Sequence, residues 1–365
     1  MPLANTVYKI TVVPGDGIGP EFCDATIQVI KAAWDGAPQL AFESYEAGAD
    51  CLTRTGIAFP DETMPACKDA DAILHGAAGL PGVLYADGTE AGQDFTLLLQ
   101  KELDLYANIR PICLFDGIEG PLRNFKLGEI DYIIVRENTE GLYASRGGGT
   151  IVGDDVSTDT LVITRKGVER IVRTAAELSR QRNGAPRDGK RRVTVVAKSN
   201  VLRSFAFFRK VATEVMAGYP DIEVDYALTD AMSVHMIERP DFYDVVVCEN
   251  FVDDLLSDLG AATVGGMGLG AAAELGDGKG YFQSSHGTAP EIAGKGIANP
   301  VANVLSGASM LTWLGNEKND GDLQSAGLRI EKAVKSALAN GSAQTPDIGG
   351  TATIKQATAA IRTAL

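Results

Sequence analysis

Short apolar runs alternate with amphipathic segments along the chain. Residues 9–13 form a β-rich run that stops at a glycine turn, and residues 21–34 then show helical periodicity. Other apolar runs of strand length cover 70–74, 132–135, 193–197 and 244–247, and helical patterns cover 164–181 and 204–217. Strands that alternate with helices predict an α/β fold.

Few segments have the composition of linkers. Gly147–Gly149 and Asn183–Arg192 are the candidates, and we expect both to be surface loops. The second ends in Lys190-Arg191-Arg192, which is more typical of a solvated loop before a strand than of a nucleic-acid patch.

Composition narrows the functional classes. The 365 residues are 45% hydrophobic, so the chain can bury a large core and is long enough for two domains. A formal charge of −15 argues against a nucleic-acid partner, which needs a basic face. No apolar run of about 18 residues and no signal-like start are present, so we expect a cytoplasmic protein without a membrane partner. The five scattered cysteines predict buried free thiols rather than a disulfide or zinc framework.

The most informative segment is Asn250–Asp258, which sets Asp254 and Asp258 four residues apart. On a helix these two carboxylates share a face and repel each other unless a cation or a proton lies between them. An acidic first helical turn is the alternative for an isolated motif of this kind.

Five other segments could carry chemistry. The turn Gly15–Gly19 is either a plain turn or a cofactor loop. Arginines at the ends of apolar runs, Arg110 and Arg136, suit either a substrate carboxylate or a structural ion pair. Lys198 follows a strand, where functional groups commonly gather, although a surface lysine is the simpler interpretation. Asp230 opens a helix as a cap or as a third metal carboxylate. The glycine-rich segment 286–300 resembles a nucleotide cradle.

Together these segments resemble the β-decarboxylating dehydrogenases, which include isocitrate, 3-isopropylmalate, homoisocitrate, tartrate and D-malate dehydrogenases. The resemblance covers nearly the whole chain, and the segments that carry it are 13–21, 105–111, 136–141, 250–258 and 286–300. It implies the two-domain isocitrate/isopropylmalate dehydrogenase fold, which is not a Rossmann fold. Residues 1–105 with 265–365 would form a large, cofactor-binding domain, and residues 106–264 a small domain with the dimer contact and the metal aspartates.

The resemblance also implies a homodimer with shared active sites. Asp254 and Asp258 of one subunit would bind Mg²⁺ or Mn²⁺ together with Asp230 of its neighbour. Lys198, also from the neighbour, would accept the substrate hydroxyl proton through a water molecule, and Tyr143 would return a proton to C3. Arg110 and Arg136 would hold the substrate carboxylates.

The implied cofactor is NAD. Glu291 and Ile292 follow the His-Gly-Thr-Ala-Pro segment, and a carboxylate there can accept from the ribose hydroxyls of NAD but repels the 2′-phosphate of NADP. By the same resemblance, the cofactor-binding residues are Asn200, His286, Gly287, Thr288, Ala289, Pro290, Glu291, Ile292 and Asn299.

The chain departs from the family pattern at the helix expected to read the C3 substituent. Gln100 stands where the family carries an arginine, and Gln93, Thr96 and Leu97 share its helical face. Neither the isopropylmalate nor the isocitrate signature is met. A 3-isopropylmalate-like acid is the best prediction, with tartrate or D-malate and isocitrate as alternatives. Asp253, where glycine or glutamate is common, has no assigned role.

Two other functions fit the sequence. The loss of the arginine at Gln100 would suit a non-catalytic regulatory subunit that pairs with an active paralogue. A simple NAD dehydrogenase that does not decarboxylate is the second alternative, and its turnover would ignore metal chelators.

Overall fold

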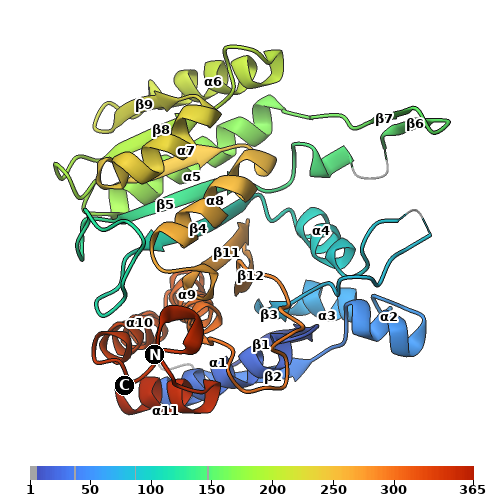
Figure 1. The fold of residues 1–365 in the computed structure, drawn as a ribbon, viewed down its shortest axis with the longest axis vertical. Helices are drawn as coiled ribbons and strands as arrows, with labels where there is room; N and C mark the ends of the chain where they lie inside the picture. The colour runs from blue at the N-terminus through green and yellow to red at the C-terminus, as the bar shows by residue number, and fades with distance from the viewer. Residues whose placement is uncertain (1–5, 37, 87, 146–147) are drawn as a thin grey trace. The chain divides into compact units, whose positions relative to one another are not determined.

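The computed structural model describes residues 6–36, 38–86, 88–145 and 148–365, with the side chain of Gln93 excepted. The chain divides into two units (Figure 1). Unit 1 comprises residues 1–103, 115–119 and 266–365, and unit 2 comprises residues 104–114 and 120–265. Unit 1 therefore contains both ends of the chain.

Unit 1 is built on five neighbouring strands. Their order is β2 (Gln39–Ser44), β1 (Val7–Gly15), β3 (Ala72–Ala77), β12 (Lys279–Ser284) and β11 (Ala271–Gly276). The first four run parallel, and β11 pairs antiparallel with β12. All six residues of β3 are buried, which is typical of a central parallel strand that is covered on both faces.

The helices of unit 1 pack on this sheet. α1 (Gly19–Ala33) contacts β1 and β3, and α9 (Val301–Lys318) contacts β11 and β12. α10 (Gly321–Ala339) packs on α9, and α11 (Ile354–Thr363) packs on α1. The other helices of the unit are α2 (Ala49–Thr55), α3 (Thr63–Asp69) and α4 (Gln93–Glu102).

Unit 2 has its own five neighbouring strands. Their order is β4 (Ala107–Cys113), β5 (Asp131–Glu137), β10 (Val245–Cys248), β8 (Arg192–Val196) and β9 (Glu223–Ala227). Only the β4–β5 pair is antiparallel. β10 and β8 are continuous buried apolar runs, apart from Arg192 and Thr194.

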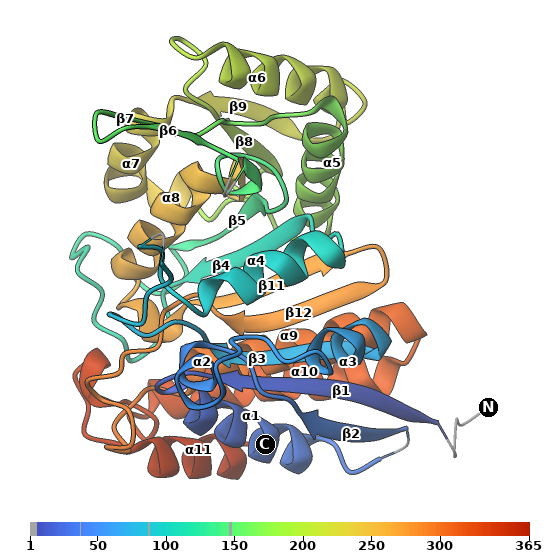
Figure 2. The same cartoon turned by 90° about the vertical axis from the view of Figure 1, so that its right-hand side faces the viewer.

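Helices lie on both faces of the unit 2 sheet (Figure 2). α5 (Arg165–Gln181) and α6 (Arg203–Met216) pack together on one face. α8 (Asn250–Thr263) packs on β4 and β5 from the other face, next to α7 (Thr229–Glu238). A separate hairpin is formed by β6 (Thr150–Val152) and β7 (Val156–Thr158).

The structure confirms the predicted α/β fold, and each predicted strand and helix has its counterpart. It corrects the prediction for Arg192, which is buried in β8 rather than solvated, because its guanidinium is paired with Asp188 at 2.7 Å and Glu223 at 2.8 Å. Of the glycine loop, Gly148 and Gly149 precede β6, and Gly147 lies outside the described residues. All five cysteines are free, and Cys113 alone is only partly buried. Within the described ranges, no helix is long and apolar enough to cross a membrane.

His75 lies in the core of unit 1. Its Nδ1 is 2.7 Å from the carbonyl oxygen of Val13, and its ring contacts Phe95 edge-on and stacks on Tyr281. Burial lowers the pKa of His75 to about 4. The imidazole of His75 is therefore neutral in the folded protein at neutral pH.

This burial predicts a loss of stability in acid. An unfolded imidazole takes up a proton near pH 6.5, whereas the folded one does so only near pH 4, so the unfolded state gains stability as the pH falls through this window. We expect His75 to cost the fold up to about 3 kcal/mol between pH 7 and pH 4. Urea unfolding of His75→Phe should show a shallower pH dependence than the wild type.

Equal slopes for His75→Phe and the wild type would contradict the assignment.

Candidate active site

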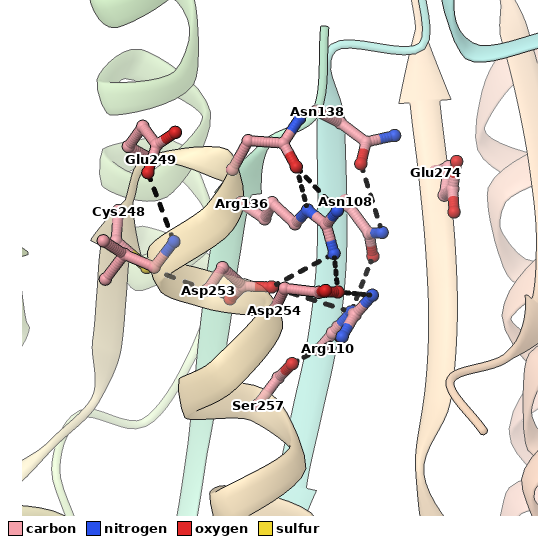
Figure 3. Close-up of polar contacts among 12 residues, drawn as sticks. Asn108, Arg110, Arg136, Asn138, Cys248, Glu249, Asp253, Asp254, Ser257 and Glu274 are labelled. Atoms are coloured by element: carbon pink, nitrogen blue, oxygen red, sulfur yellow. Dashed lines mark hydrogen bonds and ion pairs between the residues drawn. The ribbon is translucent and has the colours of Figure 1, made fainter. Parts of the chain in front are cut away.

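Two buried arginines face the first turns of α8 (Figure 3). Arg136, on β5, donates from Nε and Nη2 to Oδ1 of Asn250, at 2.9 and 2.6 Å. Its third group, Nη1, donates to Oδ1 of Asp254 at 2.7 Å. The guanidinium is thus fixed by one amide and one carboxylate. Its planar array of N–H groups is suited to binding two such partners at once.

Arg110, on the adjacent strand β4, is held one turn further along α8. Its Nη1 donates to Ser257 Oγ at 2.5 Å, and its Nε lies 3.7 Å from Oδ2 of Asp253. The same Asp253 oxygen is 4.0 Å from Nη1 of Arg136.

The structure gives Asp253 a position that the sequence left open. Its side chain is fully buried, and within the described part of the chain its Oδ2 has no hydrogen-bond partner. Burial raises the pKa of Asp253, although both arginines oppose this shift. Asp253 is therefore an internal carboxylate that balances charge between the two guanidinium groups.

Tyr143 belongs to the same cluster. It begins a short 3₁₀ turn, Tyr143–Ser145, and its hydroxyl donates to Oδ2 of Asp254 at 2.8 Å. Burial and then Asp254 raise the pKa of Tyr143 to about 12. The phenol consequently keeps its proton at neutral pH.

α8 begins at Asn250, with Glu249 as its N-cap. Burial raises the pKa of Asp258, and the charge of Asp254 adds to this shift. Burial also acts to raise the pKa of Asp254, but Arg136 and Tyr143 hold it below its ordinary value. The repulsion expected between carboxylates at i and i+4 is therefore present.

A second cluster contains Lys198 and Asp230. Lys198 follows β8, and its Nζ donates to Oδ1 of Asp230 on α7 at 2.6 Å. The hydrogen bond from Lys198 lowers the pKa of Asp230, which is an exposed side chain. Asn200 lies exposed on the turn after Lys198.

The carboxylates of α8 are donors that fit a hard divalent cation. Carboxylate oxygens are the ligands that Mg²⁺ and Mn²⁺ prefer, and a cation would relieve the repulsion within the α8 pair. Within one chain, no group of three or more His, Cys, Asp or Glu side chains in the described ranges gathers to hold a metal. Asp254 and Asp258 would thus need a third carboxylate from elsewhere.

The glycine-rich segment of unit 1 is braced by the β1–α1 turn. The backbone N–H of Ile18 donates to the carbonyl of Thr288 at 3.0 Å, and the Thr288 hydroxyl donates to Gly79 O at 2.7 Å. Asp16, also in the turn, accepts backbone N–H groups from Ala49, Asp50 and Gly79 at 2.7–2.8 Å. The turn is therefore a structural clamp for the segment.

The segment 286–299 leaves polar groups available for a ligand. Nε2 of His286 is shielded from solvent without a hydrogen-bond partner among the described residues, and Gly287, Pro290 and Glu291 are exposed. Ala289 has a positive φ of 36°, unusual for a residue with a side chain. Ile292 packs against the Ile18 cluster, and Asn299 donates to Asp347 at 3.0 Å. These features fit a dinucleotide cofactor.

The α4 face of unit 1 is tied to the sheet. Gln100 donates from Nε2 to Oε2 of Glu274 on β11 at 3.0 Å, and Thr96 on the same helix is buried. Leu97 is partly buried on α4, and the side chain of Gln93 lies outside the described side chains. Gln100 is therefore a buried residue with a charged neighbour in its own unit.

The sequence did not single out Asn250, Ser257, Asp16 or Glu274 as site residues. Glu274 would have been the easiest of these to predict from the sequence. A single acidic residue inside the apolar run Ala271–Leu275 indicates a buried polar role. Asn250 and Ser257 gave no such signal, since their partners are distant in sequence.

Comparison with known proteins agrees with this arrangement. The family model "Isocitrate/isopropylmalate dehydrogenase" matches residues 9–364. A 3-isopropylmalate/3-methylmalate dehydrogenase of Methanocaldococcus jannaschii is 43% identical over 94% of this chain and 95% of its own length. A probable tartrate dehydrogenase/decarboxylase of Agrobacterium vitis is 37% identical over 98% and 96%. The crystal structure of isocitrate dehydrogenase from Methylococcus capsulatus superposes with a TM-score of 0.85, at 35% identity over 98% and 99% of the two chains.

The fold of both units is of the α/β class, and the buried arginines and carboxylates of unit 2 are a cluster that could bind an anion. The family and the relatives indicate, more narrowly, a decarboxylating dehydrogenase. The chain belongs to the isocitrate/isopropylmalate dehydrogenase family.

Gly17 offers a test of the clamp. It has a φ of +56°, and a Cβ there would lie 2.2 Å from the carbonyl oxygen of Thr288. We expect Gly17→Ala to lower the free energy of unfolding by about 2–4 kcal/mol, because strain and a backbone clash add.

Gly278→Ala is the matched control, since Gly278 has a φ of +68° but nothing within 4 Å of its added Cβ. It should cost only about 1 kcal/mol of strain. Denaturant unfolding measures the free energy of unfolding of both variants. Equal losses would show that the contact with Thr288 does not contribute to stability.

Proposed function

We propose that the protein catalyses the NAD-dependent, Mg²⁺- or Mn²⁺-assisted oxidative decarboxylation of a 3-substituted malate, with a 3-isopropylmalate-like acid as its best candidate. The observation that carries the proposal is the cluster of Arg136, Asp254 and Tyr143, which joins an anion-binding group, a metal-type carboxylate and a phenolic proton in one place. Membership of the family supports the same reaction class.

Arg110 and Arg136 bind the substrate carboxylates in this proposal. Both guanidinium groups are buried and held by α8, so little side-chain entropy remains to be lost when an anion binds. Their charges are partly balanced by Asp253, which lets two cations lie close together before the substrate arrives.

Proton transfers are assigned to Lys198 and Tyr143. Lys198, oriented by Asp230, accepts the C2 hydroxyl proton through a water molecule. Tyr143 is protonated at neutral pH, since its pKa is about 12, and returns a proton to C3 after CO₂ leaves. Its hydroxyl is hydrogen-bonded to Asp254, one of the metal ligands in this proposal.

The metal ligands are Asp254 and Asp258 of one subunit with Asp230 of its neighbour. A bound Mg²⁺ or Mn²⁺ would supply Lewis acidity toward the C1 carboxylate and C2 oxygen of the substrate. The oxygen-only donor set agrees with either ion.

NAD is assigned to His286–Ile292 with Asn299 and Asn200. Bound NAD would accept the hydride from C2. Glu291 is exposed, so its carboxylate is free to accept from ribose hydroxyls and to repel a 2′-phosphate. The buried Nε2 of His286 is a further polar atom for the cofactor.

A homodimer with shared sites is part of the proposal. Apolar side chains stand exposed on the packed pair α7 and α8, namely Val234, Ile237, Phe251 and Leu255. Several exposed apolar side chains on a packed helix pair are typical of a protein–protein contact. A contact made by these helices joins the two elements that carry Asp230 and the α8 aspartates. The prediction of a cytoplasmic enzyme stays untested.

The domain roles also stay predictions, with 1–105 and 265–365 assigned to the cofactor and 106–264 to the dimer contact and the metal. Relatives named for 3-isopropylmalate and for tartrate support uncharged or small C3 substituents. The regulatory-subunit alternative is disfavoured, because Tyr143, Lys198 and the three aspartates are all retained.

A substrate panel tests the proposal. With NAD and Mn²⁺, the purified protein should reduce the cofactor and release CO₂ with 3-isopropylmalate, 3-methylmalate, D-malate or tartrate, and excess EDTA should abolish the turnover. NADP should be a poor substitute for NAD.

No turnover with any of these acids, or with isocitrate and homoisocitrate, would favour the regulatory-subunit alternative. Turnover that persists in EDTA and releases no CO₂ would instead support a simple dehydrogenase.

A further inference from the structure

Four polar side chains of unit 1 form a chain of hydrogen bonds across α4, β11 and β12. Gln100 donates to Glu274 at 3.0 Å, and Gln283 donates to the other oxygen of Glu274 at 2.7 Å. The hydroxyl of Tyr281 donates to Gln283 Oε1 at 3.4 Å. Glu274 is therefore held by one side chain from α4 and one from β12.

Glu274 is the charged member of this network. Its side chain is completely buried in a strand whose three preceding residues are alanines. Burying a carboxylate is costly unless hydrogen bonds satisfy it, and here an amide N–H reaches each of its two oxygens.

Glu274 also fixes the orientation of Gln100. A carboxylate offers only acceptors, so the amide nitrogen of Gln100 must face it, and the amide oxygen is directed elsewhere. Where an arginine would offer an anionic group a positive charge, this buried pair offers a neutral amide and a carboxylate.

We propose that Glu274 is a specificity-determining residue, which positions Gln100 so that the α4 face rejects C3 substituents bearing a carboxylate and admits uncharged ones. The inference rests on the proposed function, in which the face that carries Thr96 and Gln100 contacts the C3 substituent. It narrows the substrate class to malates with an alkyl group, a hydroxyl or hydrogen at C3. Isocitrate and homoisocitrate are excluded.

The pairing has a consequence for engineering. An arginine at position 100 would form an ion pair with Glu274, since the existing hydrogen bond places the two side chains in contact. Its charge would be neutralised within the protein. The glutamine and the glutamate must therefore be changed together to create a binding site for an anionic substituent.

The test compares kcat/KM for isocitrate with kcat/KM for the best uncharged substrate, in the presence of Mn²⁺ and NAD. Glu274→Gln removes the charge at nearly constant volume and should raise the isocitrate ratio about tenfold. Gln100→Arg alone should change the ratio less than threefold. The double variant Gln100→Arg/Glu274→Gln should raise it at least a hundredfold, well above the product of the two single effects.

Glu102→Gln is the matched control, because it also replaces a glutamate by glutamine. Glu102 lies on α4 two residues after Gln100, and its carboxylate is exposed and paired with Lys68. It should leave the ratio unchanged. Thermal unfolding of each variant separates a loss of folding from a change of specificity, and the ratio itself is insensitive to the fraction of active enzyme.

An unchanged ratio in Glu274→Gln, or a full shift in Gln100→Arg alone, would overturn the inference while the proposed function stands. A wild type that turns over isocitrate as well as the uncharged acids would also overturn it. A wild type that turns over no acid on the panel would overturn the proposed function, and the inference with it.

Discussion

The guanidinium of Arg136 is the interaction on which the site depends. Two of its N–H groups donate to Asn250 and a third donates to Asp254, so a single side chain from β5 fixes the first five residues of α8. The same helix carries the carboxylates assigned to the metal, and Tyr143 reaches Asp254 from a separate loop. The loss of this guanidinium would remove a charge that lowers the pKa of Asp254.

Charge balance between the aspartates of α8 and the two arginines is the constraint that explains the other features of this cluster. Three aspartates within six residues of α8 would repel one another strongly if they were alone. Two arginines offset that repulsion, and Asp253 takes the buried position between them, where its pKa rises. Asp258 is left with a raised pKa and no guanidinium as close as the one beside Asp254. A divalent cation would favour the ionised form of this side chain.

Much of the fold could be predicted from the sequence, because buried strands and amphipathic helices leave periodic patterns. The apolar runs at 132–135 and 244–247 became β5 and β10 within one or two residues. Arg192 was misjudged because burial of its guanidinium depends on Asp188 and Glu223, whose positions come from the tertiary fold. Local sequence favours a solvated loop there.

The candidate site was predictable where chemistry leaves a local signature and not where it depends on distant pairing. The spacing of Asp254 and Asp258 predicts a shared helical face without any structure. The bond between Gln100 and Glu274 joins residues 174 positions apart, and the missing arginine alone gave no hint of it. Asn250 stands inside the aspartate motif, but its role could not be predicted from the sequence. It depends on Arg136, which lies on the strand beneath it.

The central claim is that carboxylates of two subunits complete each active site, and hybrid dimers test it most directly. Lys198→Met and Asp258→Asn homodimers should each be inactive. A differently tagged heterodimer of the two variants would have one site with both defects and one intact site, made of Asp258 from the first chain and Lys198 from the second. The account predicts about half the activity of the wild-type dimer. A heterodimer as inactive as its parents would place each site within one chain and contradict it.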